Sequence, residues 1–396
     1  HLRFAPMRRL PHTLPLLVAF AACGDGGTDT SDDGPPLGDP HTLTVNDISV
    51  LLPIDAPADL WPASSVGVGG PLLPRAVFDD IAHSVFKGID GGDAEYAALR
   101  VVAARVDPCF MHNWGGVMCQ PQIRLVMQAV GDGAPAAAFD GALHLLYNLS
   151  GDEFATVVAE LRALTAYAPE QATATPLQVS PSLVAQGVAG PYGDGLRDLV
   201  LAHVGAANLA RVTFMTRTDA RAGQWEFGGR AVKAYPDTGF GEPGPLEITA
   251  IGSELQTVNQ DGVLDFAFIV EPAFAEDVGL PAASAADLAG LPPASQADVH
   301  DWAMRIERPT NTTPDSTDCA SCHIAPHARA ALEGLDPTLL STAEAAELAP
   351  RTSGSEDGNI DNLRAFGWFG AEPVISQRAA NESAHALAGI ASTYPL

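Results

Sequence analysis

Hydrophobic and polar residues alternate along several short stretches of the chain, a pattern typical of β-strands. In the clearest example, Ile123, Leu125 and Met127 alternate with polar neighbours such as Arg124 and Gln128. The same kind of pattern predicts strands at 43–52, 99–106, 122–130, 143–149, 210–216, 225–232, 246–251 and 264–270. The N-terminal two thirds of the chain is therefore expected to be rich in β-structure.

Helices interrupt these strands at irregular intervals. Ser150 and Glu153 form a capping box, and the apolar residues that follow recur at helical spacing. A second amphipathic helix is predicted at 196–209. Strands and helices do not alternate regularly enough for a doubly wound parallel sheet, so residues 43–295 are predicted to form an α+β domain with a mainly antiparallel sheet.

The pattern becomes mostly helical after an Ala-, Pro- and Gly-rich stretch at 280–293. Helices are predicted at 297–307, from Cys319 onward and at 376–391, with a capping box at Ser341 and Glu344. Pro326 should kink the helix that starts at Cys319 or begin a new one. We therefore predict a separate helical segment at 296–396.

The residues Cys319-Ala320-Ser321-Cys322-His323 carry the most specific chemical signal. Cys-x-x-Cys-His is the attachment motif of covalent haem c, in which two thiols bond to one porphyrin and the histidine is an axial ligand of the iron. A zinc site would need four convergent ligands, whereas haem needs only two thioethers and one imidazole from this stretch. One covalent haem c is therefore predicted, held by Cys319, Cys322 and His323.

The N-terminal pattern predicts export from the cytoplasm. Met7-Arg8-Arg9 precedes an apolar run at 14–22, as in a signal peptide. The run ends at Phe20-Ala21-Ala22-Cys23, which resembles the lipobox of bacterial lipoproteins, although Phe20 replaces the usual leucine. We predict a signal peptide at 1–22 and a lipid on Cys23, with cleavage near Ala22 as an ordinary secretory signal as the alternative.

Residues 23–42 are predicted to form an acidic linker that tethers the folded part to the membrane. No later stretch reaches the roughly 18 uninterrupted apolar residues of a membrane span. The membrane is therefore expected to be a partner only through the N-terminal lipid. The expected location is the cell envelope: the outer membrane, facing the periplasm or the cell surface.

Each remaining cysteine can be given a structural role. Cys109 and Cys119 flank the step between two predicted strands, 101–106 and 123–129. A disulfide at the neck of that hairpin suits an oxidising compartment. The alternative is that the two cysteines form a metal or redox pair, with only His112 between them as a further ligand.

The charge of the chain excludes one class of partner. The formal net charge is −27, with 21 basic and 48 acidic residues. Such a chain repels phosphate backbones, so nucleic-acid binding is not expected. A redox protein partner remains compatible with this charge, as does a simple role in solubility.

Together, the signal sequence, Cys23 and the Cys319–His323 motif resemble exported, lipoprotein-type c-type cytochromes with a single haem. The resemblance covers about a tenth of the chain and implies covalent haem and electron transfer. It says nothing about residues 43–295. An electron carrier is the first expectation, ahead of a catalyst.

The second axial ligand of the iron is left open by the sequence. No methionine follows His323, although small cytochromes often supply one there. The candidates are His300, Met304 and His385. Met304 is also compatible with a purely structural role in the hydrophobic core. His385 lies on the polar side of its helix. His327 is too close in sequence to reach the opposite face of the ring. Five-coordinate iron is a further alternative.

Two other functions stay open. A haem sensor or haem enzyme would keep an open position on the iron. A surface binding lipoprotein without haem would use the cysteine pair as a disulfide or as a zinc clip with His323 and His327. The stretch at 357–361 begins like a calcium loop, but Asn362 and Trp368 replace its required glycine and glutamate.

Overall fold

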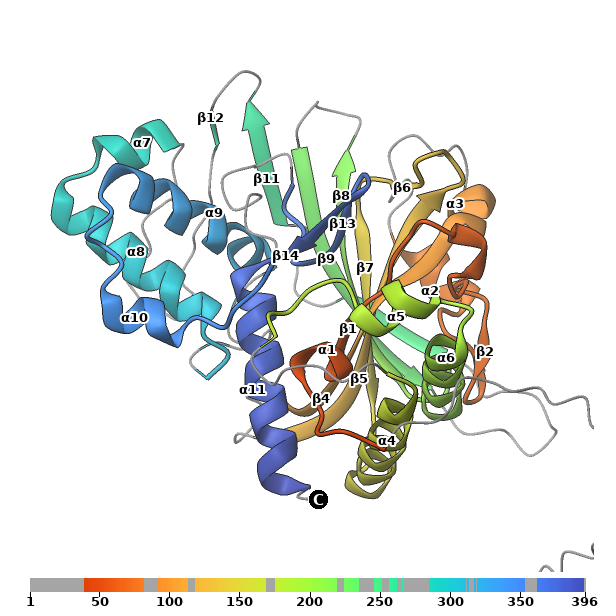
Figure 1. Ribbon diagram of the computed structural model, residues 1–396. Helices are drawn as coiled ribbons and strands as arrows, with labels where there is room; N and C mark the ends of the chain where they lie inside the picture. Colours follow the sequence, from red (N-terminus) through yellow and green to blue (C-terminus); the bar gives the residue numbers. More distant parts are fainter. Residues whose placement is uncertain are drawn as a thin grey trace, which may run out of the picture. The chain divides into compact units, whose positions relative to one another are not determined.

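The computed structural model describes most of the chain between residues 39 and 394 (Figure 1). The described residues are 39–81, 92–112, 118–168, 175–218, 224–234, 246–250, 256–261, 265–266, 285–310, 312, 317, 319–352 and 362–394. Residues Leu37–Leu396 form one compact unit, separate from His1–Pro36. The predicted signal peptide and lipidated Cys23 lie outside the described residues.

A ten-stranded sheet forms the centre of the fold, and each of its strand pairs is antiparallel. The strands follow the order β1 (Ser49–Leu51), β4 (Leu99–His112), β5 (Met118–Gly131), β7 (Ala142–Asn148), β8 (Leu209–Thr218), β9 (Gln224–Ala234), β11 (Gln256–Asp261) and β12 (Asp265–Phe266). Two further strands lie off this path: β6 (Ala137–Ala138) pairs with β5, and β10 (Leu246–Ala250) pairs with β9. The predicted α+β class with an antiparallel sheet is confirmed.

The two faces of the sheet carry different side chains because consecutive residues of a strand point to opposite faces. On β7, Tyr147 points to one face, where its hydroxyl donates a hydrogen bond to the carbonyl oxygen of Leu72. His144 points to the opposite face. Two strands away on that face, Arg105 of β4 contacts Glu382 of the C-terminal helix. The C-terminal part of the chain therefore covers the face that carries His144.

Two helices in the middle of the chain, α4 (Gly151–Leu164) and α6 (Pro191–His203), pack against each other beside the sheet (Figure 1). Ser150 caps α4 as predicted, because its hydroxyl accepts from the Glu153 amide while the Glu153 carboxylate binds the Ser150 amide. The short elements η1 (Pro57–Asp59), η2 (Thr165–Tyr167), α2 (Arg75–Asp80), α3 (Gly92–Ala98), α5 (Pro181–Gln186), β2 (Val66–Gly67) and β3 (Gly70–Pro71) complete this part.

Of the five helices described after residue 284, four lie together beside the sheet, at the left of Figure 1. They are α7 (Ala285–Gly290), α8 (Pro293–Glu307), α9 (Cys319–Leu335) and α10 (Thr342–Glu347). The fifth helix, α11 (Gln377–Thr393), packs on β4, and Ser376 caps its first turn. In the sequence, a hairpin of β13 (Phe366–Phe369) and β14 (Glu372–Ile375) lies between α10 and α11, and it packs on the sheet.

One buried side chain ties that hairpin to the sheet. Gln128 of β5 donates to the carbonyl oxygen of Trp368 at 2.9 Å and accepts from its amide at 2.8 Å, so the side-chain amide pairs with the hairpin as a neighbouring strand would. The Trp368 indole donates to the carbonyl oxygen of Leu52. Residues from both ends of the compact unit therefore share one core.

Two expectations from the sequence need correction, and one element was not expected. The predicted strand at 43–52 is wrong over its first part, because Thr44 and Asp47 form a capping box that begins helix α1 (Val45–Ile48). The helix predicted at 196–209 begins at Pro191, where proline suits a first turn, and ends at His203. The hairpin β13–β14 was not predicted.

The predicted boundary between residues 295 and 296 stays a prediction about domains. Hydrophobic residues from both sides of it belong to one buried cluster, including Leu125 and Phe227 from the sheet and Ile324, Leu332 and Ile390 from the C-terminal helices. The predicted strand at 264–270 is described only at Asp265–Phe266, and the rest lies outside the described residues.

Candidate functional site

The Cys-x-x-Cys-His motif lies in the first turns of α9, where the sequence predicted a helix start. Cys319 and Cys322 are half-buried, and neither is in a disulfide. Residues three apart on a helix lie on the same side. The helix continues through Pro326 to Leu335, so the proline does not end it, although it has no N–H to donate to the carbonyl of Cys322.

The His323 ring is held by one short hydrogen bond. Its Nδ1 lies 2.6 Å from the carbonyl oxygen of Leu363, which can only accept, so the proton is on Nδ1. Burial lowers the pKa of His323, while the hydrogen bond to Leu363 opposes that shift. The neutral ring therefore keeps its lone pair on Nε2. This is the state in which a histidine binds a metal through Nε2 and is oriented through Nδ1.

Two ring side chains of the sheet contact His323. The ring centre of Phe227 on β9 is 5.1 Å from that of His323, and the ring centre of His144 on β7 is 5.9 Å away. Burial, together with the nearby His323, lowers the pKa of His144 to about 3. At neutral pH both histidines are uncharged, so the two imidazoles can lie side by side without repulsion.

A small hollow lies beside the motif, between the start of α9, residues 362–365 and the end of β14. Its polar lining includes Cys322, His323, His327, Asn362 and Arg364. Asn362 is 1% exposed, and its Nδ2 makes no hydrogen bond to the part of the chain that the structure describes. Arg364 is paired with Asp140 at 2.7 Å. The hollow therefore offers hydrogen-bond donors next to the motif.

The residues at this site fit a covalently attached haem. Two cysteines outside any disulfide lie on the same side of α9, and the adjacent imidazole is neutral with its Nδ1 already bonded. A zinc clip would need four convergent ligands. Among the described residues, no group of three or more His, Cys, Asp or Glu side chains could hold a metal ion.

The three predicted distal ligands lie on α8 and α11, and they stay predictions. His300 is buried on α8, and its Nε2 lies 3.1 Å from a carboxylate oxygen of Glu333, ten residues beyond His323 and therefore about 15 Å along α9. Met304 is buried within the helical group, as core filler would be, and His385 is exposed on α11. His144, which does contact His323, was not singled out from the sequence.

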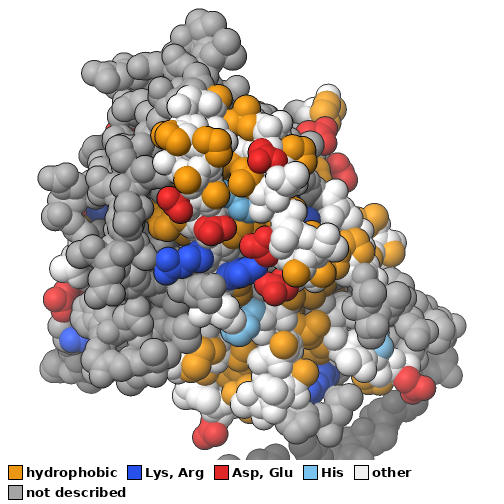
Figure 2. All heavy atoms as spheres, turned by 90° about the vertical axis from the view of Figure 1, so that its left-hand side faces the viewer, with side chains coloured by type: hydrophobic (Ala, Val, Ile, Leu, Met, Phe, Trp, Pro, Cys, Tyr) orange, Lys and Arg blue, Asp and Glu red, His pale blue; other side chains and the backbone are white. Residues whose placement is uncertain are grey.

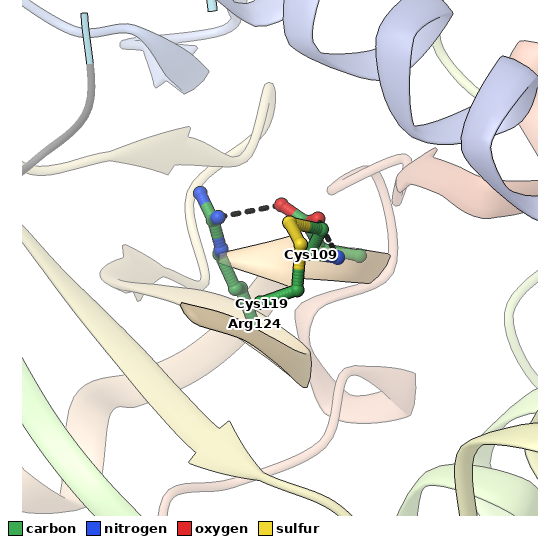
Figure 3. Close-up of a disulfide and its surroundings, with 4 residues drawn as sticks. Cys109, Cys119 and Arg124 are labelled. Atoms are coloured by element: carbon green, nitrogen blue, oxygen red, sulfur yellow. Dashed lines mark hydrogen bonds and ion pairs between the residues drawn. A yellow bond between two sulfur atoms is a disulfide. The ribbon is translucent and has the colours of Figure 1, made fainter. Parts of the chain in front are cut away.

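The predicted disulfide is present. Cys109 and Cys119 are bonded at the distal end of the β4–β5 hairpin, with Cα atoms 4.4 Å apart (Figure 3). Beside them, Asp107 accepts from the Cys109 amide at 3.0 Å and is paired with Arg124. The disulfide closes the end of the hairpin.

Comparison with known proteins identifies no relative. No protein-family model matches the chain, and neither a curated protein nor a solved structure is significantly similar to it. Within the described ranges, no helix is long and apolar enough to cross a membrane. The functional interpretation therefore depends on the site itself.

The face of the molecule that carries α7, α8, α9 and α10 has both charged and hydrophobic side chains. Figure 2 shows acidic and basic side chains close together across the middle of this face, with hydrophobic side chains above and below them. Among the helices, Arg308 and Glu347 form an ion pair at 2.8 Å, and Glu347 is largely exposed. Neither sign of charge dominates the described part of this face.

Proposed function

We propose that this protein is a c-type cytochrome-like electron carrier that binds one covalent haem and is anchored by lipid in the bacterial cell envelope. The observation that carries the proposal is the state of His323. It directly follows Cys322 on α9, and its Nδ1 hydrogen bond to Leu363 leaves Nε2 as the metal-binding atom.

In this proposal Cys319 and Cys322 hold the porphyrin and His323 is an axial ligand. The haem, when bound, supplies a one-electron couple. The Leu363 carbonyl fixes the orientation of the imidazole, and the apolar ring of Phe227 limits access of water to it. An imidazole held in one orientation would suit electron transfer, because its position need not change when the iron changes oxidation state.

The first experiment is export of the protein in a host that carries the cytochrome c maturation machinery. A haem stain on a denaturing gel and a pyridine haemochrome spectrum then measure covalent haem. The wild type should retain haem after denaturation, and Cys319→Ala/Cys322→Ala should lose it. Cys109→Ser/Cys119→Ser is the matched control, because it also removes two cysteines but should keep haem.

A haem-free wild type from this host would reject the proposal. It would favour the interpretation of a surface lipoprotein in which the Cys319–Cys322 pair is a structural clip. Covalent haem without a reversible one-electron wave would reject only electron transfer and would favour a haem enzyme or sensor.

The anchor is tested separately at Cys23. The proposal expects incorporation of radiolabelled palmitate by the wild type and recovery of the protein in the membrane fraction. Cys23→Ala should lose the label and move to the soluble fraction of the envelope. A wild type without label would leave the ordinary secretory signal as the explanation of the N-terminal pattern.

A further inference from the structure

One face of the sheet faces the Cys319–His323 motif. On this face, a row of residues that pair across neighbouring strands contains one histidine among residues with short side chains. The register aligns five residues across five strands: Ala103, Val126, His144, Thr213 and Gly229. Four of the five have small or short side chains, so His144 is the one large group in this row. It projects towards the N-terminal end of α9, where its ring lies next to that of His323.

The separation of these two rings suits a shared metal ion. The ring centres are 5.9 Å apart and the rings are inclined at 49°. Two imidazoles on opposite sides of one ion are separated by about 6 Å between ring centres, because each metal–nitrogen bond is about 2 Å and each nitrogen lies about 1 Å from its ring centre.

We propose that His144 is the second axial ligand of the haem iron, opposite His323. The inference rests on the proposed function, since it requires haem at Cys319 and Cys322. It is an alternative to the three distal candidates taken from the sequence, which stay predictions. It also assigns to the sheet a direct part in the haem site, because β7 would supply one of the two iron ligands.

Met215 is the strongest competitor within the described sheet. It is buried on β8, on the same face as His144, and pairs in register with Phe227, whose ring contacts His323. Methionine is a common haem ligand. The ring of His144 lies directly next to the ring of His323, so His144 is the better candidate. Met215 must be tested beside it.

The test uses the full-length exported protein and the spin state of its haem. Electron paramagnetic resonance and absorption spectra of the wild type should show low-spin haem, and near-infrared magnetic circular dichroism should identify two histidine ligands. His144→Ala should lose the low-spin signal, and its ferrous form should bind carbon monoxide without displacing a protein ligand. His144→Met should restore low-spin haem and raise the reduction potential.

The controls are Met215→Leu, His300→Ala, Met304→Ala and His385→Ala, each of which should keep the wild-type spectrum. Loss of the low-spin signal in any of these, with His144→Ala unchanged, would overturn the assignment. A wild type that is already five-coordinate would also overturn it while leaving covalent haem in place. Absence of covalent haem would reject the proposed function and this inference together. If His144→Ala does not fold, His144→Met tests the assignment. Low-spin haem with a raised reduction potential would support it, and an unchanged spectrum and potential would overturn it.

Discussion

Replacing Glu382 by glutamine should strongly destabilise the protein, because three arginines share this carboxylate. Glu382 of α11 contacts Arg105 of β4, lies 2.7 Å from Arg378 of its own helix, and approaches Arg124 of β5 at 3.5 Å. The Glu382 side chain is 16% exposed and the three arginines are 7–17% exposed. The neutral amide would leave these guanidinium groups with much less compensating charge.

The magnitude follows from the cost of breaking a buried ion pair, about 3–5 kcal/mol when one partner is removed. Glutamine retains one acceptor oxygen, and Arg124 keeps its pair with Asp107. We therefore expect the lower end of the range, about 3 kcal/mol. That is about a hundredfold in the folding equilibrium constant and a large part of the stability of a typical domain.

Chemical denaturation followed by circular dichroism measures this effect. Glu382→Gln should lower the midpoint while the slope stays unchanged, which indicates a change of stability alone. The matched control is Glu347→Gln, which removes the more exposed ion pair with Arg308 and should cost less than about 1 kcal/mol. A loss below about 1 kcal/mol for Glu382→Gln would refute the reasoning.

The pH dependence gives a second test. Burial alone would raise the pKa of Glu382, but the charges of Arg378, Arg105 and Arg124 hold it well below its usual range. In the unfolded chain the group titrates near about 4.3. Its contribution is therefore complete above about pH 5 and is lost as the pH falls towards the depressed pKa. The difference between wild type and Glu382→Gln should shrink between pH 6 and pH 3.

Two further predictions concern the connections within the sheet. Cys109→Ser/Cys119→Ser opens a loop with a sequence separation of 10 and should cost about 3 kcal/mol. Denaturation of wild type with and without a reductant checks this, since the reduced wild type should match the variant. Gln128→Ala leaves the amide and carbonyl of Trp368 without their side-chain partner and should cost about 2–4 kcal/mol. A loss below 1 kcal/mol would show that water or a shift of the hairpin replaces these bonds.

Local patterns predicted most of the sheet correctly. The alternation at 122–130 lies within β5, and the stretches at 99–106 and 225–232 lie within β4 and β9. The Ser150–Glu153 and Ser341–Glu344 capping boxes mark real helix starts. These signals are readable because a strand with a buried face and a capped helix each impose a short-range periodicity or spacing on the sequence.

Short elements that depend on distant partners were missed. The hairpin β13–β14 has only four residues in each strand, and it is held by Gln128, far away in the sequence. The predicted strand at 43–52 was wrong at its start because the Thr44–Asp47 capping box outweighed the hydrophobic run. The hydrophobic periodicity of the sequence indicates neither the contact between Gln128 and the hairpin nor the helix that begins after Thr44.

The sequence by itself determined the α+β class, the disulfide partners and the motif at Cys319–His323, because each depends on residue type and spacing within a short stretch. Only the tertiary structure decided what surrounds the motif. Leu363 and His144 reach His323 from far along the chain, and their positions follow from how the strands pair and how α9 lies against the sheet. A histidine within an apolar strand looks like an ordinary core residue until the register shows which side chain it faces.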